Sequence, residues 1–256
     1  MNDFFRVERL SKNFGKLMAL SDVSFSVEQG EVVGLIGPNG AGKTTFFNVV
    51  TGFNWPSSGK IFFRGKDVTN ATPNRLASMG MVRTFQIPRP FKELTVSDNV
   101  AVATLFNPKL KISTSSTKEF LKKILQGLDL YPWKDQQATT LGYGSLKRLE
   151  LGRSQGSSPE LLLLDEPFSG LNASEIEKES HILRSLVKEG ITLIIVEHKL
   201  RELMKIVDRI IVLNFGIKIA DGAPEAITKD KLVLEAYLGR RWGVNSAGDK
   251  KYNSTI

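Results

Sequence analysis

The sequence contains no cysteine and only two histidines, His181 and His198. The absence of cysteine excludes disulfide scaffolds and thiolate metal sites, and so few histidines disfavour a zinc centre. The most apolar stretches, Leu161–Leu164 and Ile191–Val196, are far shorter than the ~20 residues that a membrane-spanning helix needs. The first residues do not combine a basic segment with an apolar one, so we expect no signal peptide and a cytoplasmic location.

Positive charge is in excess but unevenly distributed. The 256 residues include 35 Lys and Arg against 27 Asp and Glu. The excess lies in residues 1–150 and 239–256, whereas residues 151–238 carry more acidic than basic side chains. A regional excess is weaker evidence for a nucleic-acid partner than a uniform basic surface would be. Residues 239–256 are polar and aperiodic, and we expect them to form a mobile tail.

The hydrophobic pattern alternates between strands and helices. Val32–Ile36 and Leu161–Leu164 are predicted to be fully buried strands, because they are apolar on both faces. Helices are predicted from Lys43 to Gly52 and over Ser174–Glu189. Other predicted strands are Phe25–Val27, Lys60–Arg64, Ile191–Val196, Arg209–Asn214 and Lys218–Asp221. The alternation predicts an α/β fold whose parallel sheet has right-handed crossovers.

The stretch from about 90 to 150 is predicted to be helical instead. Thr95–Leu105 forms one predicted helix, and apolar residues between Leu121 and Leu128 at helical spacing indicate another. The polar run Ser113–Thr117 is predicted to connect them. The chain therefore contains a helical insertion within an α/β pattern.

One glycine-rich segment fits the phosphate-binding loop pattern G-x-x-x-x-G-K-[ST], and it lies between a predicted strand and a predicted helix. Its backbone N–H groups would surround phosphate, Lys43 would reach the β- and γ-phosphate oxygens, and the Thr44 hydroxyl could bind Mg²⁺. An ordinary glycine-rich turn is the alternative. The predicted nucleotide-binding residues are Gly37, Pro38, Asn39, Gly40, Ala41, Gly42, Lys43, Thr44 and Thr45.

Two carboxylates, Asp165 and Glu166, follow the predicted strand Leu161–Leu164. They would lie at the carboxyl end of a buried strand, where α/β sheets bind ligands. Asp165 is expected to hold Mg²⁺ through water, and Glu166 to polarise the attacking water in hydrolysis. The alternative is a solvated turn before Pro167. The two motifs do not choose between a kinase, a GTPase, a helicase and a transporter ATPase.

The segment Leu141–Glu150, upstream of Leu162–Pro167, resembles the signature of the ATP-binding cassette family. The resemblance covers about residues 4–238. It implies a P-loop NTPase (RecA-like) core with a parallel-sheet Walker domain, an antiparallel β subdomain and an inserted α-helical subdomain. The implied single domain has a nucleotide-binding core at 1–86 and 151–238, a helical subdomain at about 87–150, and the tail at 239–256.

The resemblance also implies roles for other residues. Phe14 would stack on adenine, Gln86 would contact Mg²⁺ or the attacking water, and His198 would hydrogen-bond the γ-phosphate. The alternatives are a core aromatic, a polar strand end and a locally satisfied histidine. Asn172 ends the D-loop Ser169–Asn172, where it could contact a second subunit, and it also fits a helix-capping pattern.

The signature departs from the family pattern Leu-Ser-Gly-Gly-Gln. Gly142 replaces the serine, Tyr143 and Gly144 occupy the two glycine positions, and Ser145 replaces the glutamine. The family's serine contacts ATP bound by the partner cassette, so a charge-assisted hydrogen bond is missing here. This departure suggests two unequal ATP sites, formed with a different partner chain.

Within the family, the chain is most similar to ATP-binding subunits of branched-chain amino acid importers. The similarity rests on Gly80–Gln86, Phe91–Val96, Tyr143, Arg148–Leu151 and Glu235–Gly239. It implies an ATP- and Mg²⁺-dependent ATPase at the cytoplasmic face of a membrane. The implied partners are a second cassette bound head to tail, two transmembrane permeases and, indirectly, an extracytoplasmic solute-binding protein, with no nucleic acid.

Three alternatives remain from the sequence. The first is a cassette ATPase that acts on nucleic acid or the ribosome, which the net charge would fit. The second is an exporter subunit, a regulatory cassette that does not hydrolyse ATP, or the cassette of an importer for another solute. The third, a P-loop kinase, lacks a recognisable acceptor site.

Overall fold

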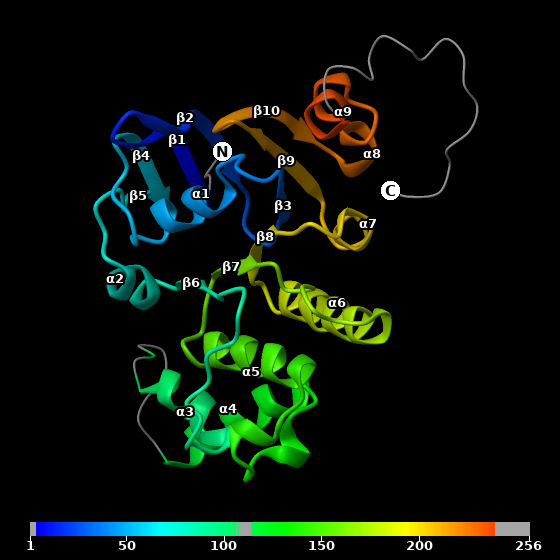
Figure 1. Cartoon of the computed structure of the whole chain (residues 1–256). Helices are drawn as coiled ribbons and strands as arrows, with labels where there is room; N and C mark the ends of the chain where they lie inside the picture. Colours follow the sequence, from blue (N-terminus) through cyan, green and yellow to red (C-terminus); the bar gives the residue numbers. More distant parts are fainter. Residues whose placement is uncertain (1–3, 106, 108–113, 239–256) are drawn as a thin grey trace, which may run out of the picture. The chain divides into compact units, whose positions relative to one another are not determined.

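The computed structural model describes residues 4–105, 107 and 114–238, so the predicted tail at 239–256 lies outside the described residues. The chain divides into two compact units (Figure 1). Unit 1 contains the described residues up to Asn70 together with those from Ile195 onward, and unit 2 contains those from Ala71 to Ile194. In the described parts of the chain, no helix is long and apolar enough to cross a membrane.

Unit 1 begins with an antiparallel sheet of strand order β2-β1-β4-β5. Its strands are β1 (Phe5–Phe14), β2 (Leu17–Val27), β4 (Ser58–Phe63) and β5 (Lys66–Asp67). In β1, Phe5, Val7 and Leu10 are buried. The pairing of β1 with β2 shifts between Val7 and Leu10, where Arg9 adopts a φ of +46°, as at a β-bulge. The antiparallel sheet that the family resemblance implied is present.

The second part of unit 1 is a sheet segment of order β10-β9-β3, formed by β3 (Val32–Ile36), β9 (Arg209–Asn214) and β10 (Ile217–Gly222). β3 and β9 are parallel, and β9 and β10 are antiparallel. All five residues of β3 are buried, as predicted from its apolar composition. The helices of unit 1 are α1 (Lys43–Val50), α7 (Leu200–Leu203), α8 (Pro224–Ile227) and α9 (Lys231–Leu238).

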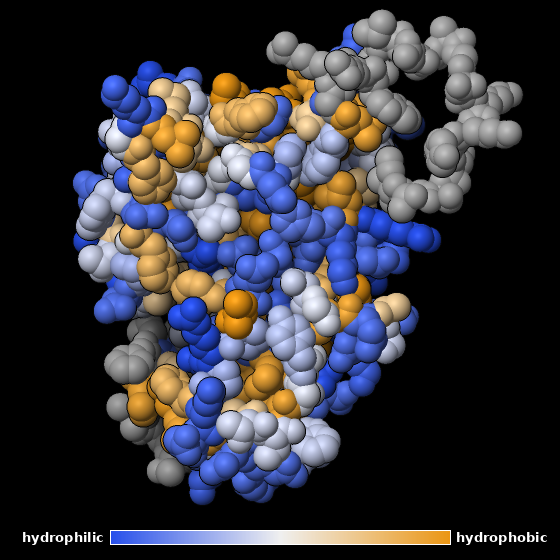
Figure 2. Space-filling view, in the orientation of Figure 1, coloured by the Kyte–Doolittle hydropathy of each residue, from blue (hydrophilic) through white to orange (hydrophobic). Residues whose placement is uncertain are grey.

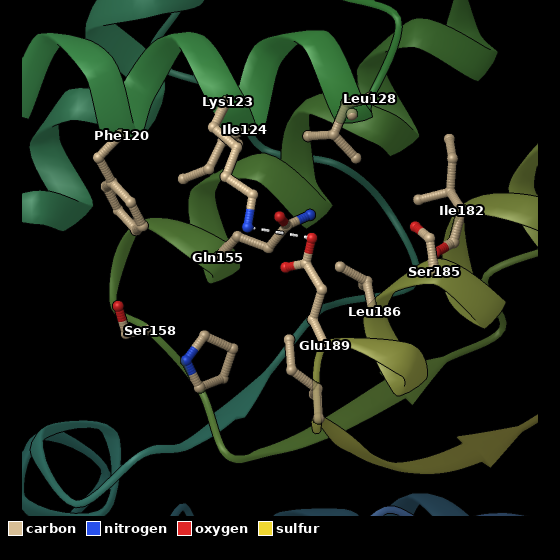
Figure 3. A pocket seen from close by; sticks show the side chains of 13 residues that line it. Phe120, Lys123, Ile124, Leu128, Gln155, Ser158, Ile182, Ser185, Leu186 and Glu189 are labelled. Atoms are coloured by element: carbon tan, nitrogen blue, oxygen red, sulfur yellow. Dashed lines mark hydrogen bonds and ion pairs between the residues drawn. The ribbon is translucent and has the colours of Figure 1, made fainter.

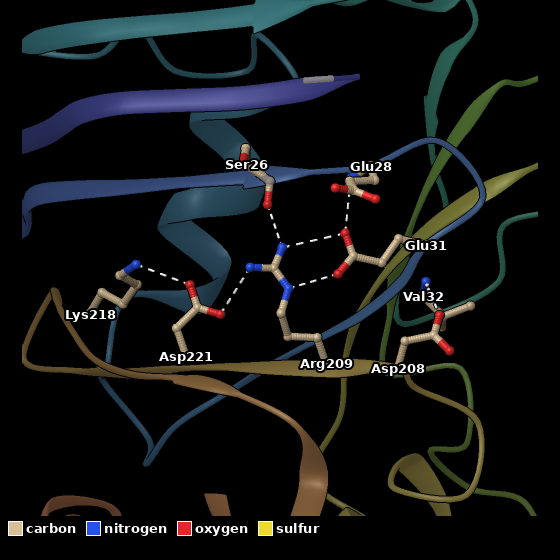
Figure 4. Close-up of polar contacts among 8 residues, drawn as sticks. All are labelled: Ser26, Glu28, Glu31, Val32, Asp208, Arg209, Lys218 and Asp221. Atoms are coloured by element: carbon tan, nitrogen blue, oxygen red, sulfur yellow. Dashed lines mark hydrogen bonds and ion pairs between the residues drawn. The ribbon is translucent and has the colours of Figure 1, made fainter. Parts of the chain in front are cut away.

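Arg209 fixes the amino-terminal ends of β3 and β9 through a network of charges (Figure 4). Its Nε donates to Glu31 Oε1 at 2.7 Å and its Nη1 to Asp221 Oδ1 at 3.0 Å. A further guanidinium nitrogen donates to the carbonyl of Ser26. These groups belong to β2, to the turn before β3, to β9 and to β10, so the network holds these four segments of unit 1 together.

Unit 2 contains strands of order β8-β7-β6, namely β6 (Met81–Arg83), β7 (Leu161–Asp165) and β8 (Thr192–Val196). The last two residues of β8 belong to unit 1. β6 and β7 are parallel, which confirms the predicted parallel arrangement for this pair. Two helices accompany these strands, α2 (Pro73–Ser78) and α6 (Ala173–Lys188).

The predicted helical stretch forms the rest of unit 2. It comprises α3 (Val96–Thr104), α4 (Thr114–Gly127), α5 (Tyr143–Gly156) and the short 3₁₀ helices η1 (Tyr131–Trp133) and η2 (Ala138–Thr140). The apolar side of α4 is buried, as its spacing predicted. Of the predicted connector Ser113–Thr117, Ser113 lies outside the described residues, and the prediction is wrong for the rest because α4 already begins at Thr114. Serine and threonine are favourable around the start of a helix whose later turns bury an apolar face.

On the face drawn in Figure 2, hydrophilic side chains are interspersed with small hydrophobic groups. Several large apolar side chains are exposed, among them Phe14, Phe85, Ile87 and Phe215. Isolated exposed apolar residues are usual for a folded protein and need no partner to explain them.

Candidate active site

The predicted phosphate-binding loop of unit 1 runs from the end of β3 to the start of α1, as its pattern requires. Lys43 opens α1 and is only 6% exposed. Its Nζ donates to the carbonyl oxygens of Gly37 at 2.6 Å and Pro38 at 3.1 Å. The ammonium group therefore lies across the loop that is predicted to surround phosphate.

Two glycines of this loop are required by close backbone approach. Gly37 has a φ of +152°, and a Cβ there would lie 2.1 Å from the Leu213 carbonyl oxygen. Gly42 has a φ of +104°, and its Cβ would lie 2.7 Å from the Ala19 carbonyl oxygen. Side chains at either position would clash with backbone that cannot move independently. The glycines thus let the loop rest directly on β9 and β2.

The start of α1 is suited to bind an anion. Gly42 occupies the N-cap without a side-chain cap, and the first turn contains no acidic residue. Uncapped N–H groups and the helix dipole make such a terminus electropositive. Thr44 is exposed and Thr45 is half-buried, so both hydroxyls lie in the first turn beside these N–H groups. Phosphate and Mg²⁺ binding by Lys43–Thr45 stays a prediction.

Phe14 and His198 are the other predicted site residues in unit 1. Phe14 ends β1 and is 45% exposed, which rules out the alternative of a core aromatic. Lys12 Nζ lies 4.9 Å from its ring centroid. His198 follows β8 and is exposed. The carboxylate of the buried Glu197 accepts hydrogen bonds from the backbone N–H groups of His198 and Lys199 and fixes this turn.

The carboxyl-terminal helix α9 also reaches the phosphate-binding loop. Burial raises the pKa of the Tyr237 phenol to about 12, against a hydrogen bond with the Gly37 backbone that lowers it. Tyr237 belongs to the segment Glu235–Gly239 that supported the subfamily resemblance, although no contact with the loop was predicted for it.

In unit 2, Asp165 ends β7 and forms an ion pair with Arg83 of β6. Arg83 Nη2 lies 2.7 Å from Asp165 Oδ2, and the two side chains are 5% and 12% exposed. Charged groups this deeply buried are stable only when they are paired. Arg83 therefore fixes one oxygen of the Asp165 carboxylate, a contact that the sequence did not predict.

Gln86 and Glu166 meet side chain to side chain. Gln86 Nε2 donates to Glu166 Oε2 at 2.6 Å, although 80 residues separate them in the chain. Glu166 has a φ of +49°, the left-handed conformation that non-glycine residues seldom adopt. The structure thus joins two of the residues predicted to act in hydrolysis, and it holds one of them in a strained backbone conformation.

Lys147 of α5 contacts the backbone of both Gln86 and Glu166. The side chain is 5% exposed, and its Nζ donates to the carbonyl oxygens of Gln86 and Glu166, each at 2.8 Å. Lys147 lies in the signature segment Leu141–Glu150 and Arg83 in the segment Gly80–Gln86, but neither was predicted to have a function. No local signal could have indicated their partners, because these lie far away in the sequence.

The predicted signature residues begin α5 and pack on the D-loop and on α6. Gly142 is the N-cap, with a φ of −66°, and the helix starts at Tyr143. A Cβ on Gly170 would lie 2.6 Å from Tyr143 Cε1, and one on Gly144 would lie 2.6 Å from Glu175 Oε1. Ser145 Oγ accepts a hydrogen bond from Arg148 Nη2 at 2.9 Å. The signature is therefore held against the segment that contains Asn172.

Asn172 caps α6 as its sequence pattern predicted. Its Oδ1 accepts from the backbone N–H of Glu175 at 3.0 Å, and Glu175 Oε2 accepts from the backbone N–H of Asn172 at 2.9 Å. This reciprocal pair is a capping box. Contact with a second subunit remains a prediction.

Glu179 of α6 is a buried carboxylate that the sequence did not single out. It is 2% exposed, and burial raises its pKa to about 7 although the positive charges of Arg148 and Lys147 oppose the shift. Burial therefore favours the protonated, uncharged form of this carboxyl group.

A cavity of about 200 Å³ lies elsewhere in unit 2, among α4, the end of α5 and α6 (Figure 3). Apolar side chains such as Phe120, Ile124 and Leu186 line it, and Lys123 Nζ pairs with Glu189 Oε1 at 3.2 Å beside it. None of the predicted site residues contributes to its lining. The cavity is therefore separate from the candidate chemistry.

The predicted site residues fall into two sets. Unit 1 holds Phe14, the loop from Gly37 to Thr45, and His198. Unit 2 holds Gln86, Asp165, Glu166, Asn172 and the signature residues Gly142 to Ser145. Within unit 2 the structure brings Gln86 to Glu166 and packs the signature on the D-loop.

Comparisons with known proteins agree on one family. The model of the ABC transporter family matches residues 20–169, and that of the branched-chain amino acid ATP-binding cassette transporters matches residues 218–242. The chain is 38% identical over 246 residues to the high-affinity branched-chain amino acid transport ATP-binding protein BraF of Pseudomonas aeruginosa, covering 91% of this chain and 96% of BraF. It is 39% identical over 243 residues to a probable branched-chain amino acid transport ATP-binding protein, LivG, of Archaeoglobus fulgidus, covering 91% and 95%.

Solved structures show the same similarity. The crystal structure of the ADP conformation of MJ1267, an ATP-binding cassette of an ABC transporter, has a TM-score of 0.85 to this chain. The sequences are 33% identical, and the match covers 93% of this chain and 100% of MJ1267. A nucleotide-free ATP-binding cassette from an ABC transporter has a TM-score of 0.83 at 33% identity, with coverage of 93% and 99%.

Proposed function

We propose the following function for this chain, which belongs to the ABC transporter family. It is an ATPase subunit that drives the uptake of branched-chain or related amino acids across a membrane. The matched relatives are named as branched-chain amino acid transport ATP-binding proteins and are covered almost over their full length. The subfamily match at residues 218–242 supports the same solute class.

ATP binding uses unit 1. The phosphates bind to the N–H groups of the Gly37–Gly42 loop and the first turn of α1, where the helix terminus is electropositive. Lys43 turns from its two carbonyl partners to the β- and γ-phosphate oxygens. Phe14, with 45% of its surface exposed, offers a ring face to adenine.

Hydrolysis uses Glu166 of unit 2 as general base. A water oxygen attacks the γ-phosphorus, Glu166 accepts the proton of that water, and the bond between the γ-phosphorus and the bridging oxygen of ADP breaks. Gln86 orients the base and the water, because its amide already holds Glu166 Oε2 at 2.6 Å. His198 donates a hydrogen bond to the γ-phosphate. The contact between Gln86 and Glu166 is the observation that carries the hydrolytic part of the proposal.

Mg²⁺ fits the oxygen donors of the chain. Among the described residues, no cluster of three or more His, Cys, Asp or Glu side chains could hold a metal ion by itself. Thr44, Gln86 and, through water, Asp165 would supply hydroxyl, amide and carboxylate oxygens, and Mg²⁺ prefers such donors together with substrate phosphates. Arg83 holds Asp165 Oδ2 at 2.7 Å, and the Asp165 carboxylate so fixed would hold the ion through water. When bound, the ion neutralises charge on the phosphates.

The subunit works with partners at the cytoplasmic face of the membrane. A second cassette binds head to tail, so that Gly142, Tyr143, Gly144 and Ser145 face ATP held by the partner, with Asn172 at the same contact. Two permease subunits span the membrane, and an extracytoplasmic binding protein supplies the solute. ATP is the polyanion that the chain's motifs recognise, and no nucleic-acid partner is needed to explain its net charge.

The test separates ATP binding from hydrolysis. The full-length chain is reconstituted with its transporter subunits, and ATP binding, ATP hydrolysis and amino-acid uptake are measured. Glu166→Gln is expected to keep ATP affinity, to lose hydrolysis by about 10²–10⁴-fold and to trap a closed cassette dimer. Lys43→Ala is expected to lose ATP binding. Full hydrolysis by Glu166→Gln would remove the role of Glu166, and ATP hydrolysis that no branched-chain amino acid stimulates would contradict the solute class.

A further inference from the structure

The buried ammonium group of Lys147 connects three separate segments of unit 2. It extends from α5 and is 2.8 Å from the carbonyl oxygens of both Gln86 and Glu166. Those residues are 61 positions before and 19 positions after it in the chain. Their side chains also contact each other at 2.6 Å. One side chain therefore holds the backbone of the two residues whose side chains meet.

Packing alone does not account for a lysine at this position. Lys147 is 5% exposed, and burying an ammonium group is costly unless strong acceptors surround it. An apolar side chain such as methionine would fill the same space without that cost. The lysine directs its donors at two backbone carbonyls, and its positive charge also acts on the buried carboxyl of Glu179. The two hydrogen bonds hold the carbonyl groups at fixed positions.

Glu166 needs such support. Its φ of +49° is a conformation that non-glycine residues keep only when their surroundings hold it. The Glu166 carbonyl accepts from Lys147 Nζ at 2.8 Å and from the Ser169 N–H at 3.1 Å. These two bonds fix the peptide group next to the carboxylate and thereby its direction.

Lys147 also lies on the same face of α5 as the signature tyrosine. Tyr143 and Lys147 are one helical turn apart, and the ammonium nitrogen lies 5.8 Å from the centroid of the Tyr143 ring. Tyr143 in turn packs on Gly170 of the D-loop. A displacement of α5 would therefore also displace Lys147 and its contacts with the carbonyl groups of Gln86 and Glu166.

We propose that Lys147 is a positioning residue for ATP hydrolysis, holding Gln86 and Glu166 in their reactive arrangement and coupling the signature helix α5 to the chain's own general base. This inference rests on the proposed ATPase function. Lys147 touches neither substrate nor metal in it. Loss of the ammonium group therefore lowers kcat for ATP and leaves the KM for ATP and the ATP affinity nearly unchanged.

The experiment compares Lys147→Met, Lys147→Cys and the wild type, each as the full-length chain in the reconstituted transporter. Both variants are expected to lose kcat by up to about 100-fold, the effect of misplacing a reacting group by about 1 Å, with KM for ATP within about twofold of the wild type. Lys188→Met, which removes an exposed lysine from the end of α6, is the matched control and is expected to leave both parameters unchanged.

Chemical rescue tests whether the ammonium group itself is required, while unchanged KM and ATP affinity exclude a loss of folding. The chain has no cysteine of its own, so Lys147→Cys can be alkylated selectively in denaturant and refolded before reconstitution. Bromoethylamine restores an ammonium group at almost the original length and is expected to recover most of kcat. Iodoacetamide adds a neutral group and is expected to recover none. The wild type, taken through the same treatment, supplies the reference rate.

Each outcome bears on a different claim. A wild-type transporter without ATP hydrolysis would contradict the proposed function itself. If the wild type hydrolyses ATP and Lys147→Met keeps its kcat, the positioning role of Lys147 is overturned while the proposed function stands. Equal loss of kcat and ATP affinity, or equal recovery with bromoethylamine and iodoacetamide, would also overturn it.

Discussion

The predicted phosphate-binding loop of unit 1 and the cluster of unit 2 that is proposed to act in hydrolysis are built by different means. This hydrolytic cluster consists of Arg83, Gln86, Lys147, Asp165 and Glu166. The loop is shaped by backbone, since Gly37 and Gly42 approach neighbouring carbonyl groups more closely than any side chain allows. The cluster is shaped by buried charged side chains, with Arg83 on Asp165 and Lys147 on the backbone of Gln86 and Glu166. Backbone geometry is encoded locally, whereas the charged contacts join segments far apart in the sequence. The two regions should therefore respond to different substitutions.

Gly37→Ala should produce the largest effect, because it attacks the backbone-built region where a Cβ would lie 2.1 Å from the Leu213 carbonyl oxygen. Steric overlap and backbone strain together are expected to reduce the free energy of unfolding by about 4 kcal/mol. Urea unfolding followed by circular dichroism measures the loss, and hydrogen exchange should localise it to unit 1.

Gly40→Ala is the matched control for this experiment. Gly40 also has a positive φ, +78°, but no atom lies within 4 Å of its Cβ position. Gly40→Ala should therefore reduce the free energy of unfolding only by the cost of the strained backbone, about 1 kcal/mol. Equal losses for the two variants would mean that close approach does not shape the loop.

Arg83→Met attacks the region built from side chains. It leaves the Asp165 carboxylate, which is 12% exposed, without its 2.7 Å partner. Breaking a buried pair from one side typically costs about 3–5 kcal/mol, and a value near 3 kcal/mol is expected here because Asp165 keeps some contact with water. The double variant Arg83→Met, Asp165→Asn should regain part of the loss in urea unfolding. If the free energy of unfolding of Arg83→Met lies within about 1 kcal/mol of the wild type, the Arg83–Asp165 ion pair does not stabilise this region.

The contrast between the regions matches what the sequence could predict. The loop and its flanking strand and helix are contiguous, so their pattern identified every residue from Gly37 to Thr45. The strands β3, β7 and β9 and the helix α6 were likewise predicted from local periodicity. Strand β1 was not, because the bulge at Arg9 interrupts the alternation of Phe5, Val7 and Leu10. The start of α4 was misplaced because its first residues are polar.

The supports of the hydrolytic cluster could not be predicted in the same way. Gln86, Asp165 and Glu166 were named from motifs, but Arg83 and Lys147 gain their importance from partners 82 and 61 residues distant. A single sequence contains no signal for such pairs, since they depend on how strands and helices are placed in space. The residues of a site were thus more predictable than the residues that hold them.

The buried carboxyl group of Glu179 should also make the stability of the protein sensitive to pH. Burial raises the pKa of Glu179 to about 7 from an ordinary value of 4.5. Between these values the folded protein retains a proton that the unfolded chain has released, so stability falls as the pH rises through this window. The loss is complete above pH 7 and is on the order of 3 kcal/mol. The measurement is the free energy of unfolding of the wild type and Glu179→Gln at pH 5 and pH 8.

Glu179→Gln cannot titrate, so its stability relative to the wild type should improve between the two pH values. Glu177→Gln, at an exposed position of the same helix, is the control and should follow the wild type. A constant difference between Glu179→Gln and the wild type at both pH values would contradict the link between burial and pH dependence.

Gly142→Ser should have the smallest effect on stability, because it adds a side chain at a position without close neighbours. Gly142 is the N-cap of α5, its φ of −66° suits any residue, and no atom lies within 4 Å of its Cβ position. A serine therefore fits without rearrangement and should stabilise the helix by a few tenths of a kcal/mol.

If the missing hydroxyl weakens the ATP site shared with the partner, Gly142→Ser should raise turnover in the reconstituted transporter on the order of tenfold. Gly142→Ala adds the Cβ without the hydroxyl and should leave turnover unchanged. Equal turnover in all three proteins would show that the backbone N–H groups at the start of α5 suffice, and that the two ATP sites do not differ through this residue.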